Sequence, residues 1–252
     1  MPSRNVIAHR LRLIYGVVFA LSIPVLLIAT NLRYVASEPK VYESGFVKYG
    51  AESSLGVDRT ELDRIGRELI AYFNSQRETP QVEVTMFGQS EPLFSREELV
   101  HLEDIKGLLG LGRRIWLITL LVSSGYVAFL FLRWRAGAWP ALARATLAGS
   151  ALTVFLGVAL AVSISLNFDW MFLQFHYVSF SNAFWQLTCP PNNLACLFQP
   201  GFFYDATKLL AAATGTEAIA AGAVAGTYLW MRRRKANSGR AEESARPAAN
   251  DG

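Results

Sequence analysis

Residues 145–166, with the sequence ATLAGSALTVFLGVALAVSISL, decide the fold of this chain. A helix of about 20 apolar residues spans the ~30 Å hydrocarbon core of a bilayer. Three other runs are similarly apolar, at residues 13–30, 115–132 and 209–231. Because 52% of the 252 residues are hydrophobic and cluster in these runs, an ordinary soluble domain is excluded. The sequence therefore predicts a mainly α membrane protein with four transmembrane helices.

Lysine and arginine are concentrated in three short segments beside the four runs. They occur in the N-terminal residues 1–12, in the link 133–144 and in the C-terminal residues 232–252. Short segments rich in these residues stay in the cytoplasm, so both termini are predicted to be cytoplasmic. Residues 31–114 and 167–208 are then extracellular. Since the net charge of +4 reflects these cytoplasmic segments, nucleic acid is not expected as a partner.

The sequence also supports predictions about the first apolar run, the C-terminal tail and one acidic residue. The run 13–30 exceeds the ~7–15 apolar residues of a secretory signal, and residues 34–37 are a poor cleavage site, which favours a retained anchor. Residues 232–252 lack hydrophobic periodicity, which predicts a disordered tail. Glu217 is the one acid inside a predicted span, so it is expected to be protonated or to face the bundle interior.

Residues 31–114 predict a small mixed α/β extracellular cap, which must pack on the membrane helices because so short a segment has a marginal core. Apolar residues at helical spacing predict an amphipathic helix within residues 58–74. These residues are Leu62, Ile65, Leu69, Ile70 and Phe73. Val82, Val84 and Met86 alternate as in a short strand.

The end of the cap carries the first of two histidines on the extracellular side. Ser95 and Glu98 match a capping box, which predicts the start of a helix that runs toward the second span. Its apolar stripe consists of Leu99, Leu102, Ile105 and Leu109. His101 shares another face with Glu97 and Asp104. Flanking carboxylates raise the pKa of an imidazole and fix its tautomer, as in many general bases.

The second histidine, His176, lies in the aromatic segment 174–185, QFHYVSFSNAFW. Aromatic belts lie at the depth of the lipid headgroups, and histidine titrates near neutral pH. Together with His101 it would form an acid/base couple whose nucleophile comes from the substrate. Each histidine alone also fits a structural role, His101 as an exposed helix residue and His176 as part of an interfacial belt.

Cys189 and Cys196 lie in the same extracellular segment, where disulfides persist. Their spacing favours a structural bridge over a thiol oxidoreductase, which uses two intervening residues. No pattern typical of a zinc site, a serine hydrolase elbow or a phosphate-binding glycine loop is present in the sequence. We therefore expect neither a metal nor a cofactor.

Two motifs resemble those of a known family. One is HLEDIK at residues 101–106, and the other is FHYVSFSNAFW at 175–185, followed by PGFFYD at 200–205. With the four spans, they make the chain similar to the bacterial integral membrane family that includes the lipoprotein intramolecular transacylases. The similarity runs from the first span through the fourth. After Trp185 the chain departs from the family pattern, because residues 186–191 replace an aspartate-proline step and add the cysteine loop.

This resemblance implies an O-to-N acyl transfer at the bacterial plasma membrane. The sn-2 acyl chain of the diacylglyceryl group would move to the α-amine of a lipoprotein's N-terminal cysteine. His101 and His176 would be the general base and acid, and the partners would be diacylated lipoprotein N-termini and membrane lipid. The alternative from a different class is a non-enzymatic scaffold that binds lipid or lipoprotein.

Supporting roles are expected for residues near the two histidines. Asp104 or Glu97 would orient His101, while Asn182 or Ser179 would donate a hydrogen bond to the oxyanion. Four aromatic residues would line the substrate pocket, namely Tyr177, Phe180, Phe184 and Trp185. Any of the four also fits an aromatic girdle without substrate contact.

Overall fold

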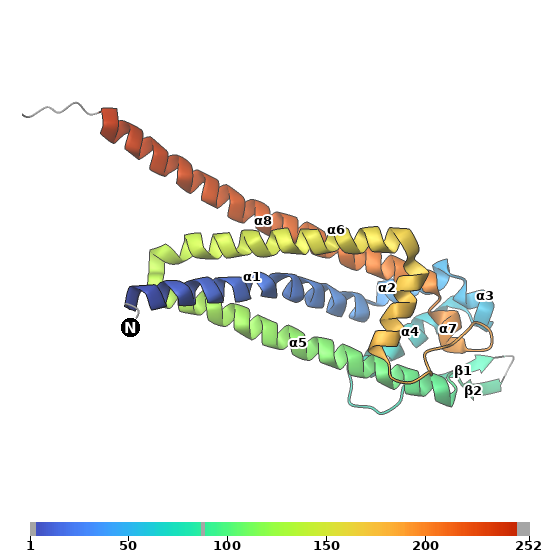
Figure 1. The fold of residues 1–252 in the computed structure, drawn as a ribbon. Coiled ribbons are helices and arrows are strands. Elements are labelled where there is room, and N and C mark those ends of the chain that lie inside the picture. The colour runs from blue at the N-terminus through green and yellow to red at the C-terminus, as the bar shows by residue number, and fades with distance from the viewer. Residues whose placement is uncertain (1–3, 87–88, 246–252) are drawn as a thin grey trace, which may run out of the picture. The chain divides into compact units, whose positions relative to one another are not determined.

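The computed structural model describes residues 4–86 and 89–245, with side chains described for 13–84, 90–135 and 137–240 (Figure 1). In chain order its elements are α1 (Arg4–Ser37), α2 (Pro39–Lys48), α3 (Ala51–Leu55), α4 (Arg59–Phe73), β1 (Glu83–Met86), β2 (Gln89–Pro92), α5 (Arg96–Trp134), η1 (Arg135–Gly137), α6 (Ala138–Ser179), α7 (Asn193–Leu197) and α8 (Pro200–Ala245). They form two compact units. Unit 1 comprises the described residues of Met1–Leu27, Ile118–Leu156 and Gly215–Gly252, and unit 2 comprises Ile28–Leu117 and Gly157–Thr214.

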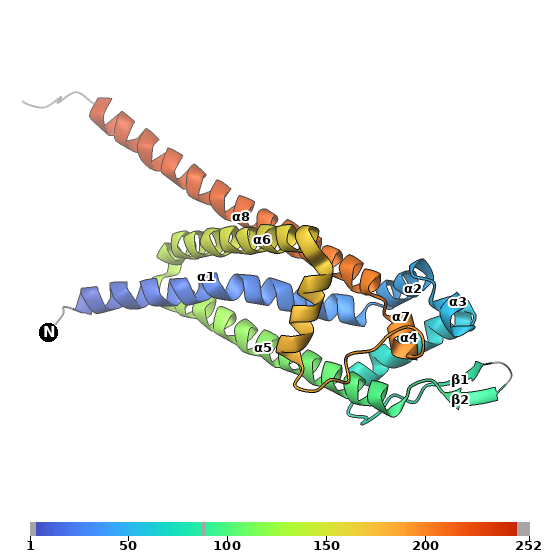
Figure 2. The ribbon, with the colours of Figure 1, turned by 45° about the vertical axis from the view of Figure 1, so that its right-hand side comes forward.

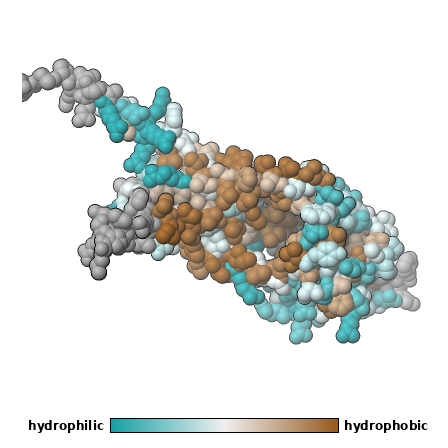
Figure 3. Space-filling model, viewed as in Figure 1, coloured by the Kyte–Doolittle hydropathy of each residue, from teal (hydrophilic) through white to brown (hydrophobic). Residues whose placement is uncertain are grey.

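Four helices in the described part of the chain are long and apolar enough to cross a membrane. They are Leu13–Ser37, Arg96–Trp134, Ala138–Ser179 and Pro200–Arg240. Each contains one of the predicted runs, so the prediction of four membrane helices is confirmed by length and composition. Apolar side chains cover much of the visible surface of these helices (Figure 3). Such a surface suits lipid, where only helices or closed barrels satisfy the backbone polar groups.

Unit 1 is held together by small residues and buried hydroxyls. A Cβ atom at Gly149 would lie 2.6 Å from the carbonyl oxygen of Ala20, so only glycine allows α6 to approach α1 this closely. The hydroxyls of Ser22 and Ser123 form a buried hydrogen bond of 2.8 Å between α1 and α5. Packing and interhelical hydrogen bonds of this kind associate helices in lipid, where no hydrophobic driving force is available.

Unit 2 contains the cap, and its predicted helix and strand are both present. The helix is α4, whose N-cap Asp58 accepts a hydrogen bond of 2.8 Å from the Glu61 backbone N–H. The strand is β1, which pairs antiparallel with β2 in the register Glu83↔Pro92. Within the described ranges, this hairpin is the entire β component. The buried core consists mainly of Tyr42, Phe46, Leu62, Ile65, Leu69, Tyr72, Leu102, Leu197 and Phe202.

The capping box at the start of α5 also connects two parts of unit 2. The Ser95 N–H donates to Glu98 Oε2 at 2.7 Å, and the Glu98 N–H donates to Ser95 Oγ at 3.4 Å. The second oxygen of Glu98 accepts a hydrogen bond of 2.7 Å from the Leu194 N–H in α7. Because its carboxylate is buried and bonded on both oxygens, Glu98 fixes α7 against the start of α5.

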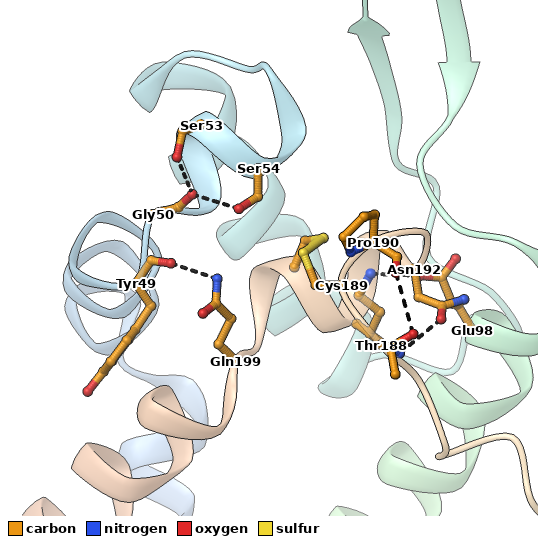
Figure 4. The surroundings of a disulfide bond; sticks show 12 residues. Tyr49, Gly50, Ser53, Ser54, Glu98, Thr188, Cys189, Pro190, Asn192 and Gln199 are labelled. Atoms are coloured by element: carbon orange, nitrogen blue, oxygen red, sulfur yellow. Dashed lines mark hydrogen bonds between the residues drawn. A yellow bond between two sulfur atoms is a disulfide. The ribbon is translucent and has the colours of Figure 1, made fainter.

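Cys189 and Cys196 are joined as a disulfide at the same place (Figure 4). The loop between them is held by a hydrogen bond of 3.0 Å from the Thr188 N–H to Asn192 Oδ1. After α7, Gln199 Nε2 donates to the Tyr49 carbonyl at 2.7 Å, which ties the segment to α2. The disulfide therefore closes a short loop on a well-anchored part of the cap.

The structure extends α6 beyond the predicted end of the third span. The helix is interrupted at Asn167, where φ is −164° and ψ is 90°. Asn167 Oδ1 accepts a hydrogen bond of 2.9 Å from the Trp170 N–H, so this side chain caps a second helical segment, residues 168–179. The segment turns sharply away from the helix before it (Figures 1 and 2). This change of direction brings the segment that carries His176 toward α5.

The fourth helix, α8, also differs from its prediction. It begins at Pro200 and continues to Ala245, so residues 232–245 are helical where the sequence predicted disorder. Alanine, arginine, lysine and glutamate have high helix propensity, and the helix of the span supplies the nucleus. Residues 246–252 lie outside the described residues. Glu217 has an exposed side chain on α8, so of the two expectations for this residue the one that it faces the bundle interior is wrong.

Candidate active site

The two histidines predicted to act together lie on different helices and meet in unit 2. His101 is on α5 and His176 is on the second segment of α6, with 6.2 Å between their ring centroids. Only 6% of His101 and 8% of His176 is exposed. Two imidazoles at this distance can contact adjacent atoms of one substrate, which is the geometry that an acid/base couple requires.

Aromatic rings surround the pair. Phe180 lies edge-on to His101 with 5.0 Å between centroids, and its ring is 5.5 Å from that of His176. Phe172 and Trp185 lie 4.3 and 5.1 Å from the His176 ring. These rings replace water around the imidazoles, so charge on either histidine is disfavoured.

Burial lowers the pKa of His101 to about 4, and repulsion by His176 contributes in the same direction, against the charge of Asp104. This result corrects the expectation of a raised pKa, because the loss of hydration outweighs the one nearby carboxylate and Glu97 is exposed. Nδ1 of His101 is buried and has no hydrogen-bond partner among the described residues. His101 is therefore a neutral imidazole at neutral pH with a polar atom available to a substrate.

The tautomer of His176 is fixed by the backbone. Its Nδ1 lies 2.7 Å from the carbonyl oxygen of Phe172, one turn earlier. Because a carbonyl oxygen only accepts, Nδ1 carries the hydrogen and donates it, and Nε2 of the neutral ring keeps its lone pair. Burial lowers the pKa of His176, while the hydrogen bond to Phe172 acts in the opposite direction. The orienting carbonyl was missed by the sequence analysis, although its position four residues before the histidine is the spacing of one helical turn.

Of the four polar residues predicted to support the histidines, two are hydrogen-bonded to each other and two form no such contact. Asn182 Nδ2 donates to Asp104 Oδ2 at 2.7 Å, and Asn182 Oδ1 accepts a hydrogen bond of 3.0 Å from the Phe184 N–H. Asn182 thus links α5 to the loop after α6. The side chains of Glu97 and Ser179 form no hydrogen bond or ion pair with other described residues. The structure therefore brings Asp104 and Asn182 to the site but does not connect the other two to it.

The predicted aromatic residues also separate into two groups. Phe180 is buried against both histidines, and Trp185 contacts both His176 and Tyr177. Tyr177 and Phe184 are 57% and 42% exposed, so their rings are available to lipid. Phe172 completes the wall, although the sequence analysis did not assign it to the pocket.

The chain was compared with known proteins. A family model described as lipoprotein intramolecular transacylase Lit matches residues 17–203, well over half of the chain. No curated protein matches it. The solved structure of the membrane integral lipoprotein intramolecular transacylase Lit from Bacillus cereus has a similar fold, with a TM-score of 0.75 and 18% identity over 90% of this chain and 99% of that one. A form of that protein with one histidine replaced by alanine has a TM-score of 0.73 and 17% identity, covering 92% and 100% of the two chains. The chain therefore belongs to the lipoprotein intramolecular transacylase family, Lit.

Proposed function

We propose that this protein is an O-to-N acyltransferase of the bacterial plasma membrane. It moves the sn-2 acyl chain of the diacylglyceryl group to the α-amine of a lipoprotein's N-terminal cysteine. Family membership supports this reaction class. The observation that carries the proposal is the convergence of His101 and His176, with 6.2 Å between ring centroids, inside a buried aromatic pocket.

The reaction transfers one proton from nitrogen to oxygen. One imidazole removes a proton as the amine attacks the ester carbonyl, and the C–O bond to the glyceryl group breaks as the other imidazole protonates that oxygen. An α-amine with a pKa of ~8 becomes nucleophilic once it is deprotonated. Since repulsion between His101 and His176 disfavours two positive charges, the pair holds at most one extra proton at a time, as such an exchange requires.

The surroundings of the histidines serve this chemistry. Amine and ester belong to one substrate molecule, and holding them in position can contribute ~7–11 kcal/mol to the lowering of the barrier. Phe172, Phe180 and Trp185 exclude the water that would otherwise hydrolyse the ester. Asp104 stabilises a positive charge on His101, and Asn182 has a remaining N–H to offer the oxyanion.

The proposed topology places this site outside the cell. The spans are residues 13–30, 115–132, 145–166 and 209–231, with both termini in the cytoplasm. Unit 2 then carries the histidines at the outer surface, where a lipoprotein's modified N-terminus is anchored. Labelling of single cysteines introduced at exposed cap positions such as Glu52, by a membrane-impermeant maleimide on intact cells, tests this orientation.

The central experiment uses the full-length protein in liposomes with a synthetic lipopeptide that carries an S-diacylglyceryl cysteine. Mass spectrometry with fragmentation locates the acyl chain. We expect conversion to the N-acyl, monoacylglyceryl product by the wild type and by His9→Ala, a matched control in the predicted cytoplasmic segment. His101→Ala and His176→Ala should each lower the rate ~10²–10⁴-fold. Full conversion by the variant lacking both histidines would contradict the proposal, and lipopeptide binding without conversion by the wild type would favour the scaffold alternative.

A further inference from the structure

A second cavity in unit 2 has a different chemical character from the histidine pocket. It has a volume of about 320 Å³ and lies between the last turns of α1, the end of α4 and the middle of α5. Two arginines, Arg33 and Arg113, contribute to its lining, and no aspartate or glutamate does. Neither arginine forms an ion pair with any residue whose side chain is described. We call this site the arginine cavity.

The planar guanidinium of Arg33 stacks on the ring of Trp116. Its guanidinium carbon lies 4.1 Å from the centroid of the Trp116 ring, and Trp116 Nε1 donates a hydrogen bond of 2.9 Å to Thr30 Oγ1, which fixes the ring. Stacking uses the face of a guanidinium and leaves its N–H groups, which point outward in the plane, available. Arg33 is therefore oriented but not hydrogen-bonded to a carboxylate.

Arg113 approaches the same cavity from α5. One nitrogen, Nη2, makes two long hydrogen bonds of 3.4 Å, to the Phe73 carbonyl and to Asn74 Oδ1. A guanidinium has five N–H donors, so most of its capacity remains for a ligand. Both arginines thus offer donors in a geometry that suits the paired oxygens of a phosphate.

The position of the arginines along the helices indicates which phosphate is available. Arg33 follows the apolar run 13–30, and Arg113 precedes the run 115–132. Because each arginine flanks a predicted span, both guanidiniums are expected at the level of the lipid headgroups, whichever side of the membrane this end faces. Leu32 and Tyr34 also line the cavity and are 38% and 57% exposed, so apolar surface adjoins the charged groups. A phospholipid combines these two chemistries in one molecule.

We propose that the arginine cavity binds the phosphate of an anionic phospholipid with a glycerol-type headgroup. The two guanidiniums clasp the phosphodiester, and the adjoining apolar side chains contact the lipid's glycerol and upper acyl region. A choline headgroup would bring a third positive charge to the two arginines, so anionic lipid is preferred over phosphatidylcholine. The site is separate from the histidine pocket and does not depend on acyl transfer.

The test is native mass spectrometry of the detergent-purified full-length protein, titrated with phosphatidylglycerol or phosphatidylcholine of identical acyl chains. We expect one tightly held phosphatidylglycerol, with at least ~10-fold higher affinity than phosphatidylcholine, because the choline of the latter would bring a third positive charge to the two arginines. Arg33→Gln and Arg113→Gln should each remove most of this preference. Arg114→Gln is the matched control, because it removes the same charge one residue along α5 from an exposed side chain outside the cavity.

One further variant and one competition experiment test the proposed site and its ligand. Arg113→Lys keeps the charge but loses the paired donors, so it should fold like the wild type and bind with intermediate affinity. Inorganic phosphate at ~10 mM should not displace the lipid, because it lacks the apolar contacts that add to affinity. Displacement by free phosphate would overturn the assignment to lipid. Equal binding of the two lipids, or equal losses in Arg113→Gln and Arg114→Gln, would overturn the site itself.

Discussion

The histidine pocket and the arginine cavity both use side chains of α5 in unit 2, yet they have opposite electrostatic character. His101 and Arg113 are twelve residues apart on that helix, or about 18 Å along its axis. In the pocket, aromatic burial removes the charge of His101. In the cavity, a guanidinium keeps its charge in any protein environment. One helix therefore carries a buried, neutral imidazole and a charged guanidinium.

The largest expected effect is the loss of acyl transfer when a histidine of the pocket is replaced, while lipid binding at the arginine cavity is unchanged. In the proposed reaction the two imidazoles act as one proton-transfer unit, so removing either should cost nearly as much as removing both, ~10²–10⁴-fold in rate. Initial rates of N-acylation for His101→Ala, His176→Ala and the double variant measure this. His101→Ala should keep the wild-type affinity for phosphatidylglycerol, and Arg114→Gln should keep the wild-type rate. Multiplicative losses in the double variant would mean that the two histidines act independently.

Removing the aromatic wall should affect the pocket next most strongly. Phe180 is 9% exposed and packs on both imidazoles, so Phe180→Ala should lower the free energy of unfolding by ~3–5 kcal/mol. Water should then reach the ester, and hydrolysed lipopeptide should appear beside the N-acyl product. Phe184→Ala is the control, because Phe184 is 42% exposed. An unchanged ratio of hydrolysis to transfer would show that Phe180 does not exclude water.

Lowering the pH should reduce the contribution of the histidine pocket to stability but should not change lipid binding at the arginine cavity. The folded-state pKa of His101 is about 4, below the ordinary value of 6.5, so the folded protein binds fewer protons than the unfolded protein between these values. The contribution of His101 to stability is therefore full above pH ~6.5 and is lost progressively as the pH falls from ~6.5 to about 4, by up to ~3 kcal/mol. Thermal unfolding of wild type and His101→Gln between pH 7 and 4 measures this contribution, which should be absent in the variant. Lipid binding by the arginines should not change through this range, since phosphodiester and guanidinium both keep their charges.

Local sequence patterns predicted the elements of both regions, because each of these patterns lies within one continuous stretch of residues. The Ser95–Glu98 capping box, helix α4 and the four spans are of this kind. The pairing of His101 with His176 was predicted from topology and from the family resemblance.

Other features that depend on distant contacts were not predicted. The pKa of His101 was expected to be raised by neighbours on its own helix, but Phe180 and His176, from a segment far along the chain, determine the burial that lowers it. The break at Asn167 follows an uninterrupted apolar run and depends on one side-chain cap. The stacking of Arg33 on Trp116 joins residues from different spans, which no local pattern reveals.

The smallest expected effect concerns the disulfide, which closes the loop that follows the aromatic wall of the pocket. Cys189→Ser should lower the free energy of unfolding by ~2–3 kcal/mol, because a short loop restricts the unfolded chain only modestly. Cys196→Ser should have a similar effect, and the double variant should be no worse than either, since one bond is lost in all three. The hydrogen bond from the Leu194 N–H of α7 to Glu98 still anchors the loop, so acyl transfer should persist at temperatures well below unfolding. Thermal unfolding and initial rates, measured with and without a reductant, test both parts. Loss of transfer in a protein that remains folded would instead indicate a role for the thiols in the chemistry, as the oxidoreductase alternative requires.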